Sequence, residues 1–239
     1  MRVPVLCYHR IEVPPRGAET DTNFVTPPQF ARHLQTLADF GCHAVTIRDI
    51  ARWQTGTLAL PSRPVAITFD DAYQSVLETA VPMLDAYDWR ATIFAVSSEL
   101  GGTNSWDHGA PRAQLLDAGS LIALAGAGHE IGSHSRCHRR ICGLDDATAH
   151  DELLGSRAAL ESIVGTRVES FAFPYGSHDR RALERVRDAG YTSACTLKRW
   201  ANGRHTNPYR IGRMSVGGAV STRLLTAKLF KLLLTPARL

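Results

Sequence analysis

The segment Val65-Ala66-Ile67-Thr68-Phe69-Asp70-Asp71 is apolar at four of its first five positions and ends in two adjacent carboxylates. Such an apolar run predicts a buried β-strand. Carboxylates at the end of a buried strand are costly, because unpaired carboxylates resist leaving water. We therefore expect Asp70 and Asp71 to have a partner at the end of this strand, and a bound cation would be one.

Further along the chain, two histidines stand four positions apart in His134-Ser135-Arg136-Cys137-His138. On a helical turn this spacing places both imidazoles on the same face, which is the arrangement we expect here. One carboxylate and two imidazoles, with coordination positions left open, suit a catalytic divalent metal. The second carboxylate of the Asp pair would then be left to act as a base.

Strand-like and helix-like segments alternate along the chain without a composition break or an internal repeat, which favours a single α/β domain with a parallel sheet or barrel. We expect strands at 3–8, 44–47, 65–69, 91–96, 130–133, 170–173 and 192–196, and helices at 27–40, 49–54, 75–87, 120–127, 145–164 and 179–189. Candidate polar residues come directly after these strands: His9, Asp70, Asp71, His134 and Tyr175. In a (β/α) barrel this is the catalytic end.

Two segments fall outside this alternation. Residues 97–112 form a long polar loop that contains Trp106, and loops of this length in a compact domain are usually functional or mobile. Residues 221–234 carry leucines against Arg223, Lys228 and Lys231. This pattern predicts a C-terminal helix within a tail at 221–239. The helix either docks on the barrel or makes peripheral contact with a membrane surface.

The composition is that of an ordinary soluble globular protein, with 239 residues, 44% hydrophobic and 21% charged. The net charge of +4 is a weak signal, which leaves an anionic substrate open; we expect no nucleic-acid partner. The five cysteines are scattered and form no CxxC pair, unlike a secreted disulfide framework. Because the first residues lack a signal-peptide core and no run of 18 apolar residues exists, we expect a cytoplasmic protein.

Three motifs together resemble the polysaccharide deacetylases of carbohydrate esterase family four, the NodB-homology domain: Thr68-Phe69-Asp70-Asp71, His134-x-x-x-His138 and Phe171-Ala172-Phe173-Pro174-Tyr175-Gly176. The resemblance covers roughly residues 3–216 of a single domain. It implies a distorted, TIM-like (β/α) barrel of about seven strands and a metal-dependent amide hydrolase acting on N-acetylated sugars. By the same resemblance Asp71, His134 and His138 bind the metal, Asp70 is the base that deprotonates the attacking water, and the backbone N–H of Tyr175 helps to hold the oxyanion.

The chain departs from the classical members of that family in three places, one of which is the absence of their Asp-Trp motif after Gly190-Tyr191. Their C-terminal acid histidine has no counterpart here. Instead Val5-Leu6-Cys7-Tyr8-His9-Arg10 resembles the circularly permuted poly-N-acetylglucosamine deacetylase branch, which makes His9 the candidate general acid. The family arginine before Pro-Tyr is replaced by Ala172, so another arginine must orient the base, and Arg213 is our candidate. Trp106, Pro174 and Arg213 are grouped as candidate substrate-binding residues, with Trp106 either a sugar-stacking platform or a loop anchor.

The leading hypothesis is an N-deacetylase acting on an N-acetylhexosamine in a glycan, glycolipid or precursor. A non-catalytic carbohydrate-binding barrel remains open, as does an esterase or non-sugar amidase. Zn²⁺ is the default metal, with Co²⁺, Ni²⁺ or Mn²⁺ as alternatives. We expect His129 to be structural, and Cys137 and Cys142 to be thiols without a zinc role. Three neighbouring arginines are either solvated or contact a phosphate-bearing substrate: Arg136, Arg139 and Arg140.

Overall fold

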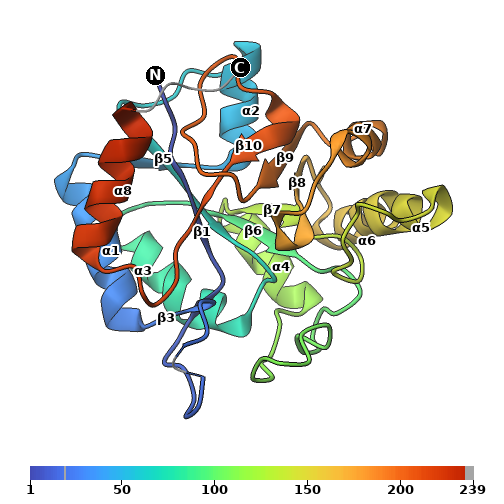
Figure 1. Cartoon of the computed structure of the whole chain (residues 1–239), viewed down its shortest axis with the longest axis horizontal. Helices are drawn as coiled ribbons and strands as arrows, with labels where there is room; N and C mark the ends of the chain where they lie inside the picture. Colours follow the sequence, from blue (N-terminus) through green and yellow to red (C-terminus); the bar gives the residue numbers. More distant parts are fainter. Residues whose placement is uncertain (19, 235–239) are drawn as a thin grey trace.

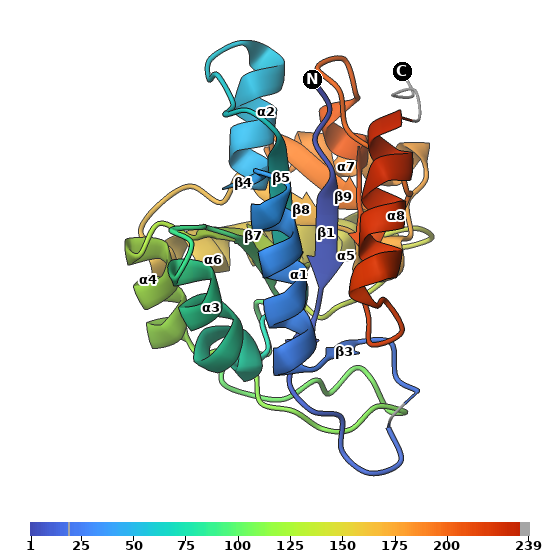
Figure 2. The ribbon, with the colours of Figure 1, turned by 90° about the vertical axis from the view of Figure 1, so that its left-hand side faces the viewer.

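The computed structural model describes residues 1–18 and 20–234. One path of parallel strands curls into a nearly closed barrel with helices outside it (Figures 1 and 2). In order around the barrel these strands are β10 (Ile211–Gly212), β9 (Ser193–Thr196), β8 (Ser170–Ala172), β7 (Glu130–Ser133), β6 (Thr92–Ala95), β5 (Pro64–Phe69), β1 (Val5–Tyr8) and β11 (Met214–Ser215). The predicted TIM-like α/β barrel is confirmed.

Three further short strands complete the description: β4 (His43–Val45), which pairs with β5, and the separate pair β2 (Arg10–Ile11) and β3 (Phe24–Val25). The barrel path has eight strands where about seven were predicted. Two of the eight, β10 and β11, were not predicted, because they have two residues each and carry too short an apolar run to be recognised. The predicted strand at 44–47 is β4, which lies off the barrel path. Only Arg213 separates them in the chain, so the two ends of the path nearly meet around this residue.

The helices lie close to the predicted positions: α1 (Pro27–Asp39), α2 (Ile47–Thr55), α3 (Val81–Asp85), α4 (Ala118–Gly126), α5 (Asp146–His150), α6 (Ser156–Val164), α7 (Arg180–Asp188) and α8 (Thr222–Leu234). Two 3₁₀ turns, η3 (Pro174–Gly176) and η4 (Pro208–Arg210), lie between β8 and β10. The predicted helices 75–87 and 145–164 are each interrupted by a π-helical turn, η1 (Val76–Ala80) and η2 (Asp151–Gly155). Apolar periodicity does not resolve the single extra residue of such a turn.

The alternation of side chains along β5 explains how the barrel is filled. Val65, Ile67 and Phe69 belong to the large apolar cluster between the sheet and the helices, whereas Ala66 belongs to the smaller cluster inside the barrel. Successive side chains of a strand point to opposite faces, so Thr68 and Asp70 share the inward face with Ala66. The first carboxylate of the Asp pair is therefore directed into the barrel by the strand itself.

The C-terminal helix docks on the barrel, which confirms the first of the two alternatives for the tail. It lies next to α1 in both ribbon views (Figures 1 and 2), and Leu225 and Leu229 are buried in the main core. The segment that leads into α8 is fixed as well, because the Nε2–H of His33 donates to the Val220 carbonyl at 2.8 Å. The side chains of Phe230 and Leu232–Leu234, and residues 235–239, lie outside the described part of the chain. Among the described residues, no helix has the length and apolar character required to cross a membrane.

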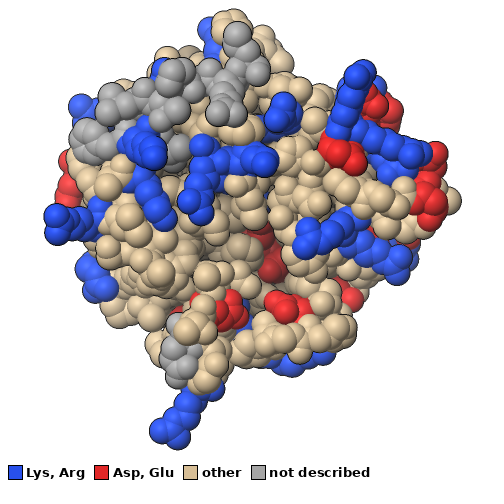
Figure 3. Space-filling model, in the orientation of Figure 1, with Lys and Arg blue, Asp and Glu red and all other residues tan. Residues whose placement is uncertain are grey.

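Surface charge is dispersed over the face drawn in Figure 3, where Lys and Arg form several separate groups and acidic side chains lie among those at the right. The helix α7 is on that side in the matching ribbon view, and its Arg181 and Arg185 both pair with Asp146. Ion pairs made by a solvent-exposed carboxylate of this kind contribute little to stability. On this face the mild net positive charge is therefore partly compensated and gives no single basic patch.

Candidate metal centre

The polar residues singled out by their positions after strands meet at one end of the barrel. His9 follows β1, Asp70 and Asp71 follow β5, His134 follows β7, and Tyr175 lies in the turn η3 after β8. The candidate ligand atoms of Asp71, His134 and His138 all lie within 4.8 Å of one another, and so do those of Cys7, His9 and Asp70. The parallel sheet therefore gathers two adjacent clusters from segments far apart in the sequence.

The cluster of Asp71, His134 and His138 has the properties of a cation site. The Oδ1 atom of Asp71 lies 3.4 Å from His134 Nε2 and 3.3 Å from His138 Nε2, and all three side chains are buried. This Oδ1 has no hydrogen-bond partner among the described residues. A buried carboxylate oxygen facing two imidazole nitrogens without hydrogen bonds is expensive unless a cation satisfies all three atoms. The donor set, one carboxylate oxygen and two imidazole nitrogens, fits a divalent metal.

The protonation states favour metal binding. Burial lowers the pKa of His134 to about 4, so its imidazole is neutral near pH 7. Because its Nδ1 lies 2.8 Å from the carbonyl oxygen of Ala172, Nδ1 carries the proton and Nε2 presents a lone pair toward Asp71. Burial alone would raise the pKa of Asp71, but His138 and His134 outweigh it and hold that pKa below its usual value. Asp71 therefore stays ionised.

The two histidines do not lie on a helical turn, contrary to our prediction. The segment that follows β7 is an irregular loop in which Ser135 and His138 have left-handed backbones, with φ of 68° and 58°. The loop bends at Arg136 and Cys137 between the two histidines, and the two imidazoles approach each other with ring centroids 4.9 Å apart. The ring of His138 is stacked on Trp106, with centroids 4.6 Å apart and planes at 22°, and meets the edge of Tyr175 at 4.7 Å. One face of Trp106 therefore packs on a candidate metal ligand, which makes it an anchor of the long loop.

Asp70 lies beside this centre and is held by Arg213. The two guanidinium nitrogens donate to its two carboxylate oxygens, at 2.6 Å for Nη1 to Oδ1 and 2.7 Å for Nη2 to Oδ2. Arg213 also donates to Thr68 Oγ1 at 3.1 Å, and the thiol of Cys7 donates to Asp70 Oδ2 at 3.4 Å. Burial opposes ionisation of Asp70, yet the charges of Arg213 and His134 hold its pKa well below the usual range.

The position of Arg213 corrects its grouping with the substrate-binding candidates. Its side chain is fully buried under Asp70, so it faces the carboxylate and not the open end of the barrel. Pro174 is also buried. The sequence did not identify Cys7 and Thr68 as hydrogen-bond partners of the Asp70–Arg213 pair. Thr68 stands two residues before Asp70 and so shares its face, whereas Cys7 is recognisable only after β1 pairs with β5 and places it opposite Thr68.

The second cluster, Cys7, His9 and Asp70, fits a metal poorly. Burial raises the pKa of the Cys7 thiol well above its ordinary value, and a neutral thiol is a weak ligand. Both oxygens of Asp70 already receive hydrogen bonds from Arg213. His9 instead follows β1, is partly exposed, and has a ring nitrogen within 4.8 Å of an Asp70 carboxylate oxygen.

Tyr175 occupies a strained turn at the edge of the centre. Its backbone is left-handed, with φ of 60° and ψ of 11°, and the turn is closed by the Gly176 N–H donating to the Phe173 carbonyl at 2.8 Å. Non-glycine residues held in this conformation cluster at functional sites. The ring is 49% exposed, and the guanidinium carbon of Arg140 lies 4.1 Å above it. This turn is the part of the site that borders solvent.

The remaining candidates lie outside the centre. His129 is buried at the opposite end of β7, where its Nδ1 accepts the Ala91 N–H at 3.2 Å, as expected for a structural histidine. Cys137 and Cys142 are free and partly buried. Of the neighbouring arginines, Arg136 pairs with Asp151 and only Arg140 reaches the rim of the site.

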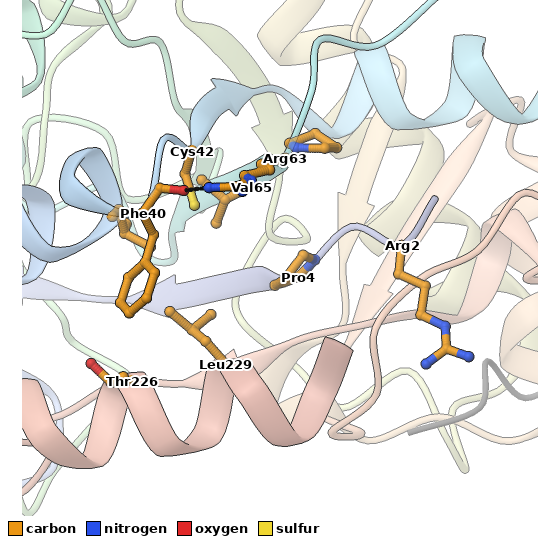
Figure 4. A pocket seen from close by; sticks show the side chains of 10 residues that line it. Arg2, Pro4, Phe40, Cys42, Arg63, Val65, Thr226 and Leu229 are labelled. Atoms are coloured by element: carbon orange, nitrogen blue, oxygen red, sulfur yellow. Dashed lines mark hydrogen bonds between the residues drawn. The ribbon is translucent and has the colours of Figure 1, made fainter. Parts of the chain in front are cut away.

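A cavity of about 270 Å³ lies at the other end of the barrel, near the first residues of β1 and β5 (Figure 4). Its lining is mostly apolar and comes from α1, α8 and the starts of these strands, and Arg63 beside it donates to the Phe40 carbonyl at 2.6 Å. None of the candidate catalytic or metal-binding residues contributes to it. We assign the chemistry to the C-terminal end of the strands.

Comparison with known proteins gives consistent matches. The family model for polysaccharide deacetylases matches residues 58–194, more than half of the chain. YxkH of Bacillus subtilis (strain 168) is 24% identical over 220 residues, which cover 92% of this chain and 73% of that protein. The poly-beta-1,6-N-acetyl-D-glucosamine N-deacetylase of Staphylococcus epidermidis is 22% identical over 205 residues, covering 84% and 71%. The Streptococcus pyogenes deacetylase PplD, solved in complex with acetate, shares the fold with a TM-score of 0.83 at 19% identity, over 95% of this chain and 98% of that one.

Proposed function

This chain belongs to the polysaccharide deacetylase family, and we propose that it is a metal-dependent N-deacetylase that releases acetate from an N-acetylhexosamine residue of a glycan. The observation that carries the proposal is the convergence of Asp71, His134 and His138 on one point with Asp70 beside it. The position of Asp70 directly beside these ligands, where it can take a proton from a water molecule in the site, favours a hydrolase over a binding module. The names of the staphylococcal relatives support a polymer of N-acetylglucosamine as the substrate class.

We assign Asp71, His134 and His138 as the metal ligands, with Zn²⁺ as the default ion. A divalent ion held by these three residues would lower the pKa of a water molecule and would polarise the amide carbonyl. Asp70 accepts the proton of the attacking water. Its Oδ2 lies 3.9 Å from His134 Nε2, which places the carboxylate beside the metal centre. Because Arg213 makes Asp70 a weak base, its contribution depends on proximity to an already acidified water.

We assign His9 the role of supplying the proton that the departing amine requires, since it follows β1 beside Asp70 and is partly exposed. The backbone N–H of Tyr175 stabilises the oxyanion, a role that depends on position more than on side-chain chemistry. The strained turn η3 keeps that N–H in place, with Pro174 buried beneath it. Trp106 stacks on His138, and we assign its partly exposed ring a contact with a sugar ring of the substrate.

The first prediction concerns the metal. Replacing Asp71 with Asn should raise the dissociation constant for Zn²⁺ by at least about a hundredfold, because loss of an outer-shell partner alone costs 10- to 100-fold and this change removes a ligand charge. The measurement is the metal content after dialysis against a chelator, followed by titration of the apo-protein. Asp70→Asn is the matched control, since it removes the neighbouring carboxylate and should leave binding nearly intact. Equal metal retention in wild type and Asp71→Asn would reject the ligand assignment.

The second prediction concerns the substrate. Acetate release should occur with β-1,6-linked and β-1,4-linked N-acetylglucosamine oligosaccharides, and a chelator should abolish it. Acetylated xylan tests the esterase alternative, and a phosphate-linked N-acetylhexosamine tests whether Arg140 at the rim favours an anionic group. Release from the xylan alone would make the protein an esterase. Metal-loaded protein that releases acetate from none of these substrates, yet binds the oligosaccharides, would make it a carbohydrate-binding barrel.

A further inference from the structure

A buried glutamate, Glu152, accepts hydrogen bonds from the backbone of the loop that carries His134 and His138. The side chain of Glu152 is 3% exposed, and its Oε2 accepts two successive backbone N–H groups of this loop, from Arg136 at 3.0 Å and from Cys137 at 2.9 Å. The Nε atom of Arg139 lies 3.7 Å from the other carboxylate oxygen. One carboxylate therefore contacts two positions between the two histidines, Arg136 and Cys137, and the position directly after the second histidine, Arg139.

Glu152 reaches the loop from an irregular part of its helix. It belongs to the π-helical turn η2, which lies between α5 and α6. A π turn adds one residue to a helix and changes the direction of the side chains around it, and such turns occur frequently at functional sites. In this chain the turn coincides with the residue that contacts the loop.

The loop needs such support because its backbone is unfavourable on its own. The left-handed conformations of Ser135 and His138 are unfavourable for residues with a Cβ atom and persist only where the surroundings fix them. A carboxylate accepting two N–H groups is among the stronger hydrogen-bond arrangements available in a protein interior. Without it, both N–H groups would be left without their acceptor and the loop would lose the contact that sets its path.

We propose that Glu152 is a positioning residue for the metal centre, which fixes the loop so that the imidazoles of His134 and His138 converge on Asp71. The inference rests on the proposed function, because it assigns the loop to metal binding. A positioning residue differs from a purely structural one in the effect of its loss. Removing the Glu152 carboxylate should change the affinity and geometry of the metal site more than it changes folding. The carboxylate itself stays outside the ligand set.

The test uses Co²⁺ added to the full-length apo-protein, since its visible absorption spectrum reports ligand geometry. Glu152→Leu should raise the Co²⁺ dissociation constant by about 10- to 100-fold, the usual effect of losing an outer-shell partner, and should alter the spectrum. Glu152→Gln should stay within about threefold of wild type, because its amide oxygen accepts the same two N–H groups. Glu152→Asp keeps the charge but shortens the reach, so it should weaken Co²⁺ binding as well.

Glu161 provides a matched control. It lies on α6, and its Oε1 accepts the backbone N–H of Val168 at 3.0 Å, away from the two histidines. Glu161→Leu should leave Co²⁺ affinity and spectrum unchanged. Wild-type Co²⁺ affinity and spectrum in both Glu152→Leu and Glu152→Asp would overturn the inference and leave the proposed function standing. If Glu152→Leu does not fold, Glu152→Asp decides alone. A wild-type protein that binds no Co²⁺ would overturn both.

Discussion

Replacing Asp70 with Asn lowers the rate constant for acetate release by at least about a hundredfold, the scale expected when a general base is removed. The variant should retain its metal, because Asp71, His134 and His138 remain in place. The asparagine amide is neutral and cannot accept a proton at neutral pH, although it has nearly the same shape as the carboxylate. Single-turnover acetate release by metal-loaded protein, compared at equal metal content, measures this change.

Asp70→Asn and Asp71→Asn together separate the two carboxylates. The first should lose rate with metal bound, and the second should lose metal. Because Asp70→Asn leaves the buried Arg213 without its counter-ion, the variant must be shown to be folded at the assay temperature by circular dichroism. A folded, metal-loaded Asp70→Asn protein that works at a near-normal rate would reject Asp70 as the base. If Asp70→Asn lost its metal and Asp71→Asn kept its metal but lost rate, the roles of base and metal ligand would have to be exchanged.

The strand ends were predictable from sequence because local patterns determine them. An apolar run followed by a polar residue marks the C-terminal end of a buried strand, and His9, Asp70, Asp71, His134 and Tyr175 all lie at or just beyond such ends in the structure. In a parallel barrel these ends share one face. The proximity of the clusters therefore follows from strand pattern and topology alone, without knowledge of any side-chain contact.

The conformation of the two-histidine loop was not predictable in this way. A four-residue spacing is compatible with a helix, but it is equally compatible with a loop that reverses direction. What selects the loop is tertiary: Glu152 accepts the Arg136 and Cys137 N–H groups, and Trp106 stacks on His138. These partners come from a helix and a loop distant in sequence. In the sequence, Glu152 has no feature that distinguishes it from a solvent-exposed helical glutamate.

The role of Arg213 was predictable from the sequence only in part. The absence of an arginine at Ala172 indicates that another one must serve Asp70, but only the pairing of β10 with β9 and of β11 with β1 places Arg213 there. The two positions are close in the barrel, since Ala172 and Phe94 share its interior cluster and the guanidinium of Arg213 lies 5.4 Å from the Phe94 ring. In this chain the arginine that pairs with Asp70 therefore comes from the residue between β10 and β11, and not from the end of β8.

Replacing Arg213 with Met should lower the free energy of unfolding by about 3–5 kcal/mol, the usual effect of breaking a buried ion pair by removing one partner. Both side chains are buried, and Asp70 would keep a charge that neither water nor a cationic partner compensates. Activity should fall as well, because the carboxylate loses the two bonds that fix its orientation. Equilibrium denaturant unfolding of the apo-protein measures the first effect, and acetate release by metal-loaded protein measures the second.

A double-mutant cycle distinguishes a specific pair from general damage to the barrel. If Arg213 acts through Asp70, the double variant Asp70→Asn/Arg213→Met should be more stable than the sum of the single losses predicts, with a coupling free energy of about 2 kcal/mol or more. Arg210→Met, an exposed arginine on the same segment, should change stability by less than about 0.5 kcal/mol. Additive losses would show that Arg213 stabilises the barrel independently of the base. They would leave the carboxylate to be oriented by Cys7 and by the strand that carries it.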